Sequence, residues 1–268
     1  MAAKDSGITM ENIQILVAAH KIVPMPQQAM YVPIQVGAAL SSTQFPEFTQ
    51  DDSGSGPNIS QKNPYFNELT AIYWARHNSD ADVIGLVHYR RFFSQTRQKD
   101  LSKILNATQL QSLLEKTAVI VPKKRRYLIE SSASHYRHAH HDMPLDVLRE
   151  VIATQQPEYL EAFDRNMART WAHMFNMFIM RREIFNAYVD WLFDILFAVE
   201  ARIQEDVETW DGYEQRVYGF LSERLLDVWL EQNQIAYTEV PVVFMAKQNW
   251  LLKGGCFVAR KIGIGRRQ

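Results

Sequence analysis

The residues best suited to chemistry are His88, Tyr89, Arg90 and Arg91, which directly follow an apolar segment, 82–87, that we predict to be a buried strand. In open α/β sheets, ligands bind beyond the carboxyl ends of the strands. A guanidinium group offers a fixed fork of donors that fits phosphate oxygens. The pattern therefore fits a clamp for a diphosphate, with His88, Arg90 and Arg91 as catalytic candidates. It fits equally well a strand end with solvated arginines.

A second candidate lies on a helix that we predict over 213–233. Arg216, Gly219 and Glu223 recur there at spacings of three and four, so they share one stripe of the helix. Glu223 could act as a general base held by Arg216 or Arg224. Glycine inside a helix costs about 1 kcal/mol relative to alanine, so Gly219 indicates close packing or a nearby ligand. A salt-bridged helix surface would give the same pattern.

Three polar groups have less specific patterns. Asp51 and Asp52 lie in a turn-rich loop over 49–58 and could bind a divalent cation, although a solvated loop is the better interpretation. The histidine group, His135, His138, His140 and His141, could bind zinc, but no cysteine is near and the helical His-Glu-x-x-His arrangement is missing. Histidines that bind sugar or phosphate, or that lie on the surface, are the better interpretation, so we predict no metal site. His173 lies beside the segment 174–180 and Asn176 within it, and both fit either satisfied core groups or sugar contacts.

Alternating elements must position these residues. Strands are predicted over 13–19, 31–37, 82–87, 118–122, 174–180 and 240–245, and helices over 60–77, 108–116, 145–154, 157–167, 183–203 and 213–233. Strands that alternate with helices favour a mostly parallel central sheet with helices on its faces. The second half of the chain is richer in predicted helix. We therefore expect one α/β domain.

Composition excludes several classes of protein. The chain has 268 residues with 29 Lys and Arg against 30 Asp and Glu, so its formal net charge is -1, which excludes a generally basic nucleic-acid binder. One cysteine, Cys256, excludes a disulfide scaffold. Residues 1–12 resemble a polar leader without a signal-peptide core, and no run reaches the ~18 apolar residues of a membrane span. We expect a cytoplasmic protein.

Basic residues gather at two places. Lys123, Lys124, Arg125 and Arg126 form a short cluster after the strand over 118–122. The tail over 251–268 places Arg260, Lys261, Arg266 and Arg267 among apolar and glycine residues. Such a tail could rest on an anionic membrane surface.

Several long motifs, taken together, resemble a known family. They include Ile15-Leu-Val-Ala-Ala-His-Lys21, Tyr31-Val-Pro-Ile-Gln-Val-Gly-Ala38, Asn58-Ile-Ser-Gln-Lys-Asn63, Asn67-Glu-Leu-Thr-Ala71, Ile84-Gly-Leu-Val-His-Tyr-Arg-Arg91, Ala172-His-Met-Phe-Asn-Met-Phe-Ile-Met180, Tyr218-Gly-Phe-Leu-Ser-Glu-Arg-Leu225, and Pro241-Val-Val-Phe244 with Lys247-Gln-Asn-Trp250. The chain resembles, over about 13–250, the bacterial glycosyltransferases of capsular polysaccharide and exopolysaccharide synthesis, long known only as a domain of unknown function.

The resemblance implies a GT-A-like nucleotide-sugar fold, with a nucleotide-binding half over about 13–122 and an acceptor and catalytic half over about 123–250. It implies a UDP-sugar donor, galactose or galactofuranose being the sugars of some relatives. It also implies a lipid-linked glycan acceptor at the cytoplasmic face of the membrane, in capsule, O-antigen or exopolysaccharide assembly. His88-Tyr89-Arg90 stands where that fold usually has Asp-x-Asp carboxylates that hold a metal. We therefore expect metal-independent catalysis, with Arg90 and Arg91 stabilising the UDP leaving group.

The resemblance also assigns roles to single residues. His20 and Lys21 are expected to line the uridine or ribose site, and Asn63, Glu68, Thr70 and Tyr89 to complete the donor pocket. His135, Tyr136, His173, Asn176 and Arg216 are expected to contact sugars. Glu223 is the expected base, and Asp142 a weaker candidate. A non-catalytic subunit that binds a nucleotide-sugar or a glycan and supports another transferase is the alternative, favoured by the missing Asp-x-Asp.

Overall fold

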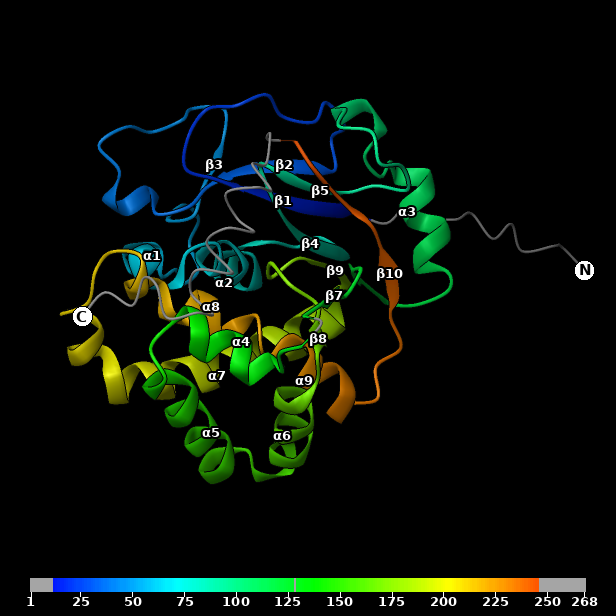
Figure 1. Ribbon diagram of the computed structural model, residues 1–268. Helices are drawn as coiled ribbons and strands as arrows, with labels where there is room; N and C mark the ends of the chain where they lie inside the picture. Colours follow the sequence, from blue (N-terminus) through cyan, green and yellow to red (C-terminus); the bar gives the residue numbers. More distant parts are fainter. Residues whose placement is uncertain (1–11, 128, 246–268) are drawn as a thin grey trace, which may run out of the picture.

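The computed structural model describes residues 12–127 and 129–245 and is drawn in Figure 1. Its centre is a sheet in which neighbouring strands follow the order β10-β6-β9-β4-β1-β2-β3. These strands are β1 (Ile13–Ala19), β2 (Tyr31–Gln35), β3 (Thr49–Gln50), β4 (Val83–His88), β6 (Val119–Pro122), β9 (Phe178–Arg181) and β10 (Thr238–Val240). Along this path only β9 runs against its neighbours. The expected mostly parallel sheet is therefore confirmed.

Two further strands and a separate ribbon complete the β-structure. β5 (Arg91–Phe93) pairs with the end of β4 and with β11 (Val242–Phe244), both antiparallel. β7 (Arg125–Arg126) and β8 (Trp171–Ala172) form a two-stranded ribbon outside the main sheet. The predicted strand over 240–245 is thus two strands, β10 and β11, separated at Pro241, which has no N–H to donate to a ladder.

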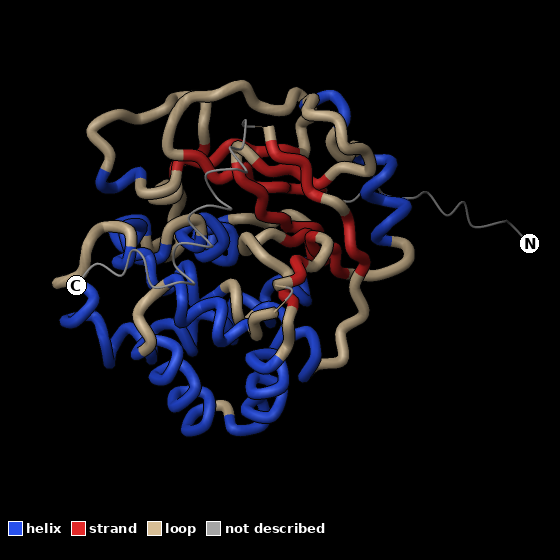
Figure 2. The backbone as a smooth tube through the Cα atoms, viewed as in Figure 1, coloured by secondary structure: helices blue, strands red, loops and turns tan. Residues whose placement is uncertain are grey.

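Helices cover both faces of the sheet, most of them on one side, as Figure 2 shows. They are α1 (Asn63–Phe66), α2 (Leu69–Asn78), α3 (Ala107–Leu114), α4 (Ser132–Ala139), α5 (Met143–Gln155), α6 (Leu160–Ala168), α7 (Arg182–Val207), α8 (Val217–Ser222) and α9 (Leu226–Gln232). β1 explains the two layers, because successive side chains of a strand point to opposite faces. Leu16 packs with the large helical cluster, whereas Ile15 and Val17 pack with the cluster that contains α3 residues.

Two predicted helices are interrupted. The helix expected over 60–77 is a short 3-10 turn followed by α1 and α2, because Asn67 between them has a positive φ of 51°. The helix expected over 213–233 is likewise a 3-10 turn (Glu214–Arg216) followed by α8 and α9. Helical periodicity predicted the apolar sides of both segments but not the breaks.

The burial of Asp51 corrects both interpretations of this residue, the preferred one of a solvated loop over 49–58 and that of a cation site. The Asp51 carboxylate is buried and accepts hydrogen bonds from the backbone N–H groups of Gly37 (2.7 Å) and Ala38 (2.9 Å). The Thr70 hydroxyl donates to it over 2.6 Å, and the Ser60 hydroxyl donates as well. Because these four donors occupy the carboxylate, Asp51 ties the loop to the start of α2.

We expect Asp51→Ala to lower the free energy of unfolding by about 3–5 kcal/mol, since four buried donors lose a charged acceptor. Urea unfolding followed by circular dichroism measures the change. Asp52→Ala, in the next residue of the same turn, is the matched control and should change stability little. Equal stability of the two variants would contradict the structural role of Asp51.

Candidate active site

A cleft of about 820 Å³ lies where β1 and β4 end, between the sheet and helices α1, α4 and α8. It has the position at which open α/β sheets bind ligands. Eleven residues proposed from the sequence line it: His20, Asn63, Glu68, His88, Tyr89, Arg90, Arg91, His135, Tyr136, Arg216 and Glu223. Residues from both halves of the chain therefore meet in one cavity.

Four proposed residues are absent from the described lining of the cleft. Thr70 is fully buried and faces Asp51. His173 and Asn176 are buried behind the cleft, where each is held by polar partners. Lys21 is exposed, and its ammonium group lies 5.5 Å from the centre of the Tyr89 ring. Direct contacts of Thr70, His173 and Asn176 with donor or sugar stay predictions; in the described chain these side chains contact other protein groups.

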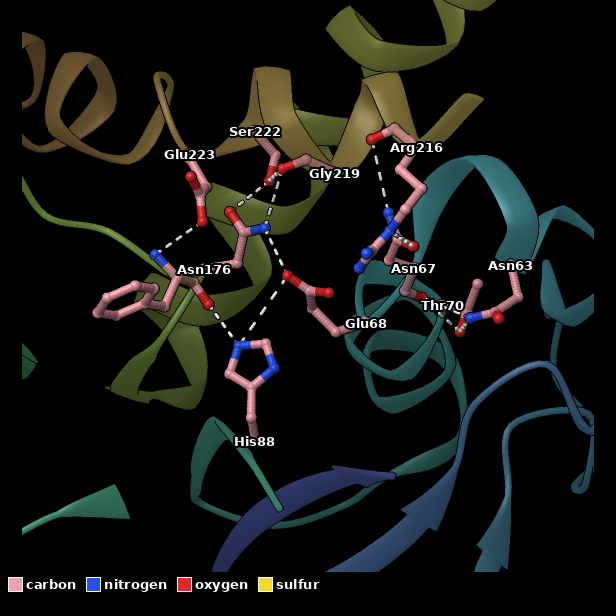
Figure 3. A network of polar contacts seen from close by, with 11 residues as sticks. Asn63, Asn67, Glu68, Thr70, His88, Asn176, Arg216, Gly219, Ser222 and Glu223 are labelled. Carbon is pink, nitrogen blue, oxygen red and sulfur yellow. Dashed lines mark hydrogen bonds and ion pairs between the residues drawn. The ribbon is translucent and has the colours of Figure 1, made fainter. Parts of the chain in front are cut away.

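The strained turn at Phe175 and Asn176 is the centre of the polar network in Figure 3. Both residues have positive φ values, 81° and 52°, where a strand was predicted over 174–180. The turn directs the N–H of Phe175 to Glu223 Oε1 (3.0 Å) and its carbonyl oxygen to His88 Nε2 (2.6 Å). Such backbone costs about 1–3 kcal/mol for each residue and persists only where the surroundings fix it.

Asn176 joins the two carboxylate-bearing walls of the cleft. Its amide nitrogen donates to Glu68 Oε1 (2.8 Å) and to the carbonyl oxygen of Gly219 (3.1 Å), and its Oδ1 accepts from the Ser222 hydroxyl (2.5 Å). Glu68 lies at the start of α2, and Gly219 and Ser222 lie on α8. Asn176 therefore sets the distance between these two helices.

His88 is held in one tautomer by its surroundings. Its Nε2 must donate to the Phe175 carbonyl, and the same atom lies 4.0 Å from Glu68 Oε1. In the neutral ring this leaves Nδ1 as an acceptor. Burial lowers the pKa of His88; Glu68 opposes this effect, and Arg91 adds to it. The side chain is therefore suited to accept a hydrogen bond from a ligand at neutral pH.

Glu223 has the environment of a base. Burial raises the pKa of its carboxyl group, and nearby Glu68 raises it further, while Arg224, the Phe175 N–H and Arg91 lower it. Arg224 lies 3.7 Å from its Oε2. A carboxylate with a raised pKa takes up a proton more readily, which is the property required of a general base.

Five arginines line the cleft, against two carboxylates, Glu68 and Glu223. The Arg91 guanidinium packs on the Phe175 ring at 4.5 Å, and its Nε has no hydrogen-bond partner in the described chain. Arg224 donates to the Tyr127 hydroxyl (2.8 Å), and its buried Nε is also without a described partner. Arg90 is exposed beside the Tyr89 ring. This excess of cations suits a polyanionic ligand such as a diphosphate.

Arg216 connects α1 to the segment before α8. Its Nε donates to Asn67 Oδ1 (2.7 Å), so it is held by an amide and does not pair with Glu223 as the helical stripe suggested. Gly219 lies against the same asparagine, and a Cβ there would come within 2.6 Å of Asn67 Nδ2. The glycine thus reflects close packing, one of the two expectations. Asn67 was not proposed from the sequence, although it is the first residue of the motif Asn67-Glu-Leu-Thr-Ala71, which was a signal.

Members of the histidine group contact different carboxylates. His135 and His138 both contact Glu130, at 3.0 and 2.9 Å, whereas His140 contacts Glu214 at 3.1 Å. Within residues 12–127 and 129–245, no group of three or more His, Cys, Asp or Glu could hold a metal ion. His140 also lines the cleft, stacked 4.0 Å from the Phe220 ring, and Phe220 was not proposed from the sequence.

His173 is enclosed by two carboxylates behind the strained turn. Its Nδ1 pairs with Asp227 and its backbone N–H donates to the same residue over 2.9 Å, while its Nε2 lies 3.2 Å from Glu239. Burial alone would lower the pKa of His173, but Asp227 and Glu239 outweigh it and raise that pKa. His173 therefore holds the start of the turn as an imidazolium between two anions.

A raised pKa in the folded state gives stability that is complete below the ordinary value of 6.5 and is lost as pH rises through the raised pKa. We expect His173→Gln to lower the free energy of unfolding by about 3 kcal/mol below pH 6.5, because the buried Asp227 carboxylate loses its cationic partner, whereas Glu239 keeps its ion pair with Lys124. The variant should also lose the decrease in stability that the wild type shows as pH rises through the raised pKa of His173. Thermal melts at a series of pH values below and above 6.5 measure the loss of stability and its pH dependence. His77→Gln, at an exposed histidine, is the control. A decline of unchanged size in His173→Gln would contradict this role.

Residues 14–234 match the model of a protein family described as "Domain of unknown function (DUF4422)". The match covers most of the chain. This chain belongs to the DUF4422 family. No curated protein matches the sequence.

The DUF4422 chain is similar to a solved structure, described as the apo structure of the WbbM bifunctional glycosyltransferase. The two share 27% sequence identity with a TM-score of 0.80, over 88% of this chain and 46% of WbbM. The chain thus spans about half the length of the relative that it matches.

The predictions about membranes concern, in part, residues that the structure of this DUF4422 chain does not describe. No helix in the described part of the chain is long and apolar enough to cross a membrane. The basic tail over 251–268, the motif Lys247-Gln-Asn-Trp250 and Cys256 lie outside the described residues. The leader over 1–12 lies outside them too, except for Asn12.

Proposed function

We propose that this chain is a glycosyltransferase that moves a sugar from a UDP-sugar to the hydroxyl group of a glycan. The observation that supports this most is the cleft at the ends of β1 and β4, in which arginines surround two carboxylates. The similarity to WbbM, whose description names a bifunctional glycosyltransferase, supports the same class of reaction.

In the proposed reaction an acceptor hydroxyl attacks the anomeric carbon of the donor sugar. Its oxygen forms the new glycosidic bond while the bond from that carbon to the UDP oxygen breaks. Glu223 accepts the hydroxyl proton. UDP leaves as an anion, and Arg90 and Arg91 stabilise the charge that develops on its phosphates. His20, Asn63, Glu68 and Tyr89 would bind the nucleoside and donor sugar.

We further propose that the reaction needs no divalent metal. In the chain, His88 ends β4 and Tyr89 and Arg90 follow it, where the related fold is expected to have metal-binding carboxylates, and the buried Asp51 is already held by four donors. Cations fixed in the protein can perform the electrostatic task of Mg²⁺ or Mn²⁺. The acceptor is a lipid-linked glycan of capsule, O-antigen or exopolysaccharide assembly, and galactose or galactofuranose is the transferred sugar.

The decisive experiment measures binding and turnover of a panel of UDP-sugars, once with EDTA and once with Mn²⁺. We expect one donor to bind in EDTA and to release UDP when an acceptor glycan is added, and binding to weaken in Arg90→Ala. Binding and UDP release that occur only with Mn²⁺ would contradict the metal-free mechanism. Saturable binding without UDP release would favour the alternative, a non-catalytic subunit, which the replacement of the expected carboxylates also favours.

A further inference from the structure

The β7–β8 ribbon carries positive charge that the described chain does not neutralise. Lys123, Arg125 and Arg126 are exposed, and none of them has an ion-pair partner among the described residues. In contrast, exposed arginines on the helices pair with carboxylates; Arg149 donates two hydrogen bonds to Asp164, at 2.8 and 2.7 Å. Of Lys123, Arg125 and Arg126, only Arg125 lines the cleft in the described chain, so Lys123 and Arg126 carry unpaired positive charge outside the catalytic network.

The pairing register gives this ribbon two different faces. Arg125 lies opposite Ala172, and Arg126 lies opposite Trp171. Directly opposed residues share a face and successive residues alternate, so Arg126 and Trp171 lie on one side and Arg125 on the other. Arg125 lines the cleft. The face with Arg126 and Trp171 is therefore the outer one.

The surface around the ribbon has the composition of a membrane-surface site. Trp171 is half-buried, with the Lys124 ammonium 4.5 Å and the Arg169 guanidinium 4.9 Å from its ring centre. Three residues after Arg126, the side chain of Ile129 is 72% exposed. Tryptophan is enriched at membrane interfaces, exposed apolar side chains enter the headgroup boundary, and basic residues are attracted to anionic lipids.

We propose that the surface around the ribbon, on which Lys123, Arg126 and Ile129 are exposed and Trp171 is half-buried, docks on the anionic headgroups of a lipid bilayer. Because Arg125 lines the cleft and Arg126 is the next residue, docking would hold the cleft beside the bilayer. An acidic protein would be attracted by the charge alone, whereas the exposed Ile129 favours lipid. The inference rests on the proposed function for its purpose, since a lipid-linked acceptor is presented at that surface.

Vesicle flotation of the full chain tests this proposal, with phosphatidylcholine vesicles that either contain or lack phosphatidylglycerol. We expect flotation only with phosphatidylglycerol, and less of it at high salt. Lys123→Gln with Arg126→Gln should weaken binding about fivefold for each cation removed. Ile129→Asn should weaken it further. Arg125 stays intact because it lines the cleft.

The controls remove equal features elsewhere. Arg97→Gln with Lys99→Gln removes two exposed cations, and Ile22→Asn removes an isoleucine that is also 72% exposed. Flotation of the ribbon variants equal to that of these controls would overturn the proposal and move attention to another surface, such as the tail. Release of UDP is measured separately. If the protein releases UDP but the ribbon variants float like the wild type, only the docking surface is rejected. If flotation depends on the ribbon but no UDP is released, only the proposed function is rejected.

Discussion

Glu223→Gln should lower kcat by about 10²–10⁴-fold, the usual contribution of a positioned general base. The amide has the same shape as the carboxylate and can still accept the hydrogen bond from the Phe175 N–H, which is 3.0 Å long in the wild type. It cannot take up the proton of the acceptor hydroxyl. Donor binding should change little, so the KM for the UDP-sugar should stay near that of the wild type. Initial rates of UDP release measure both constants.

The stability of this variant should move in the opposite direction. A raised pKa means that the folded protein disfavours the charged form of Glu223. Replacing that charge with a neutral amide should therefore keep or increase the free energy of unfolding at neutral pH. A loss of activity together with a stable fold would separate catalysis from folding.

The pH dependence follows from the same raised pKa. The base works only when it is ionised, so activity should fall as pH decreases through the pKa of Glu223. This acidic limb should lie above the ordinary value of 4.5. Glu68→Gln is the matched control, because Glu68 is the other carboxylate of the cleft and is proposed to bind the donor. A larger loss of kcat in Glu68→Gln than in Glu223→Gln would exchange the two roles.

The strand ends of this site could be predicted from sequence because each follows a continuous apolar run. β1 and β4 were expected within one residue of their observed bounds, and both deliver polar residues to the same edge of the sheet. Burial on both faces requires such runs, and parallel neighbours place their carboxyl ends together. Local hydrophobicity was thus enough to find His88, whereas the role of His20 was assigned by the family resemblance.

The supporting turns could not be predicted in the same way. Asn67, Phe175 and Asn176 have positive φ, and periodicity carries no information about single residues in that region. The Phe175 conformation depends on Glu223 and His88, which lie 48 and 87 residues away in the chain. Arg224 was considered only as a partner of Glu223. Its contacts with Tyr127 and Ser132 arise from packing between distant segments.

Arg91→Met should lower kcat by about 10²–10³-fold, the typical cost of removing one fixed donor that stabilises charge in the transition state. Methionine keeps much of the side-chain length and can still pack on the Phe175 and Phe244 rings, which lie 4.5 and 5.7 Å from the guanidinium carbon. The variant therefore removes charge with limited loss of packing. UDP release in EDTA, at saturating donor, measures the effect.

Arg91→Lys separates charge from geometry. Lysine keeps a positive charge but lacks the planar fork of donors, so we expect partial recovery of kcat. Arg97→Met, which removes an exposed arginine outside the cleft lining, is the matched control and should retain wild-type turnover. If Arg91→Met also retained wild-type turnover in EDTA, charge on UDP would have to be stabilised by the other four arginines of the cleft. Arg90→Met in the same assay would then show whether the exposed arginine is sufficient, because it is the next basic residue at the end of β4.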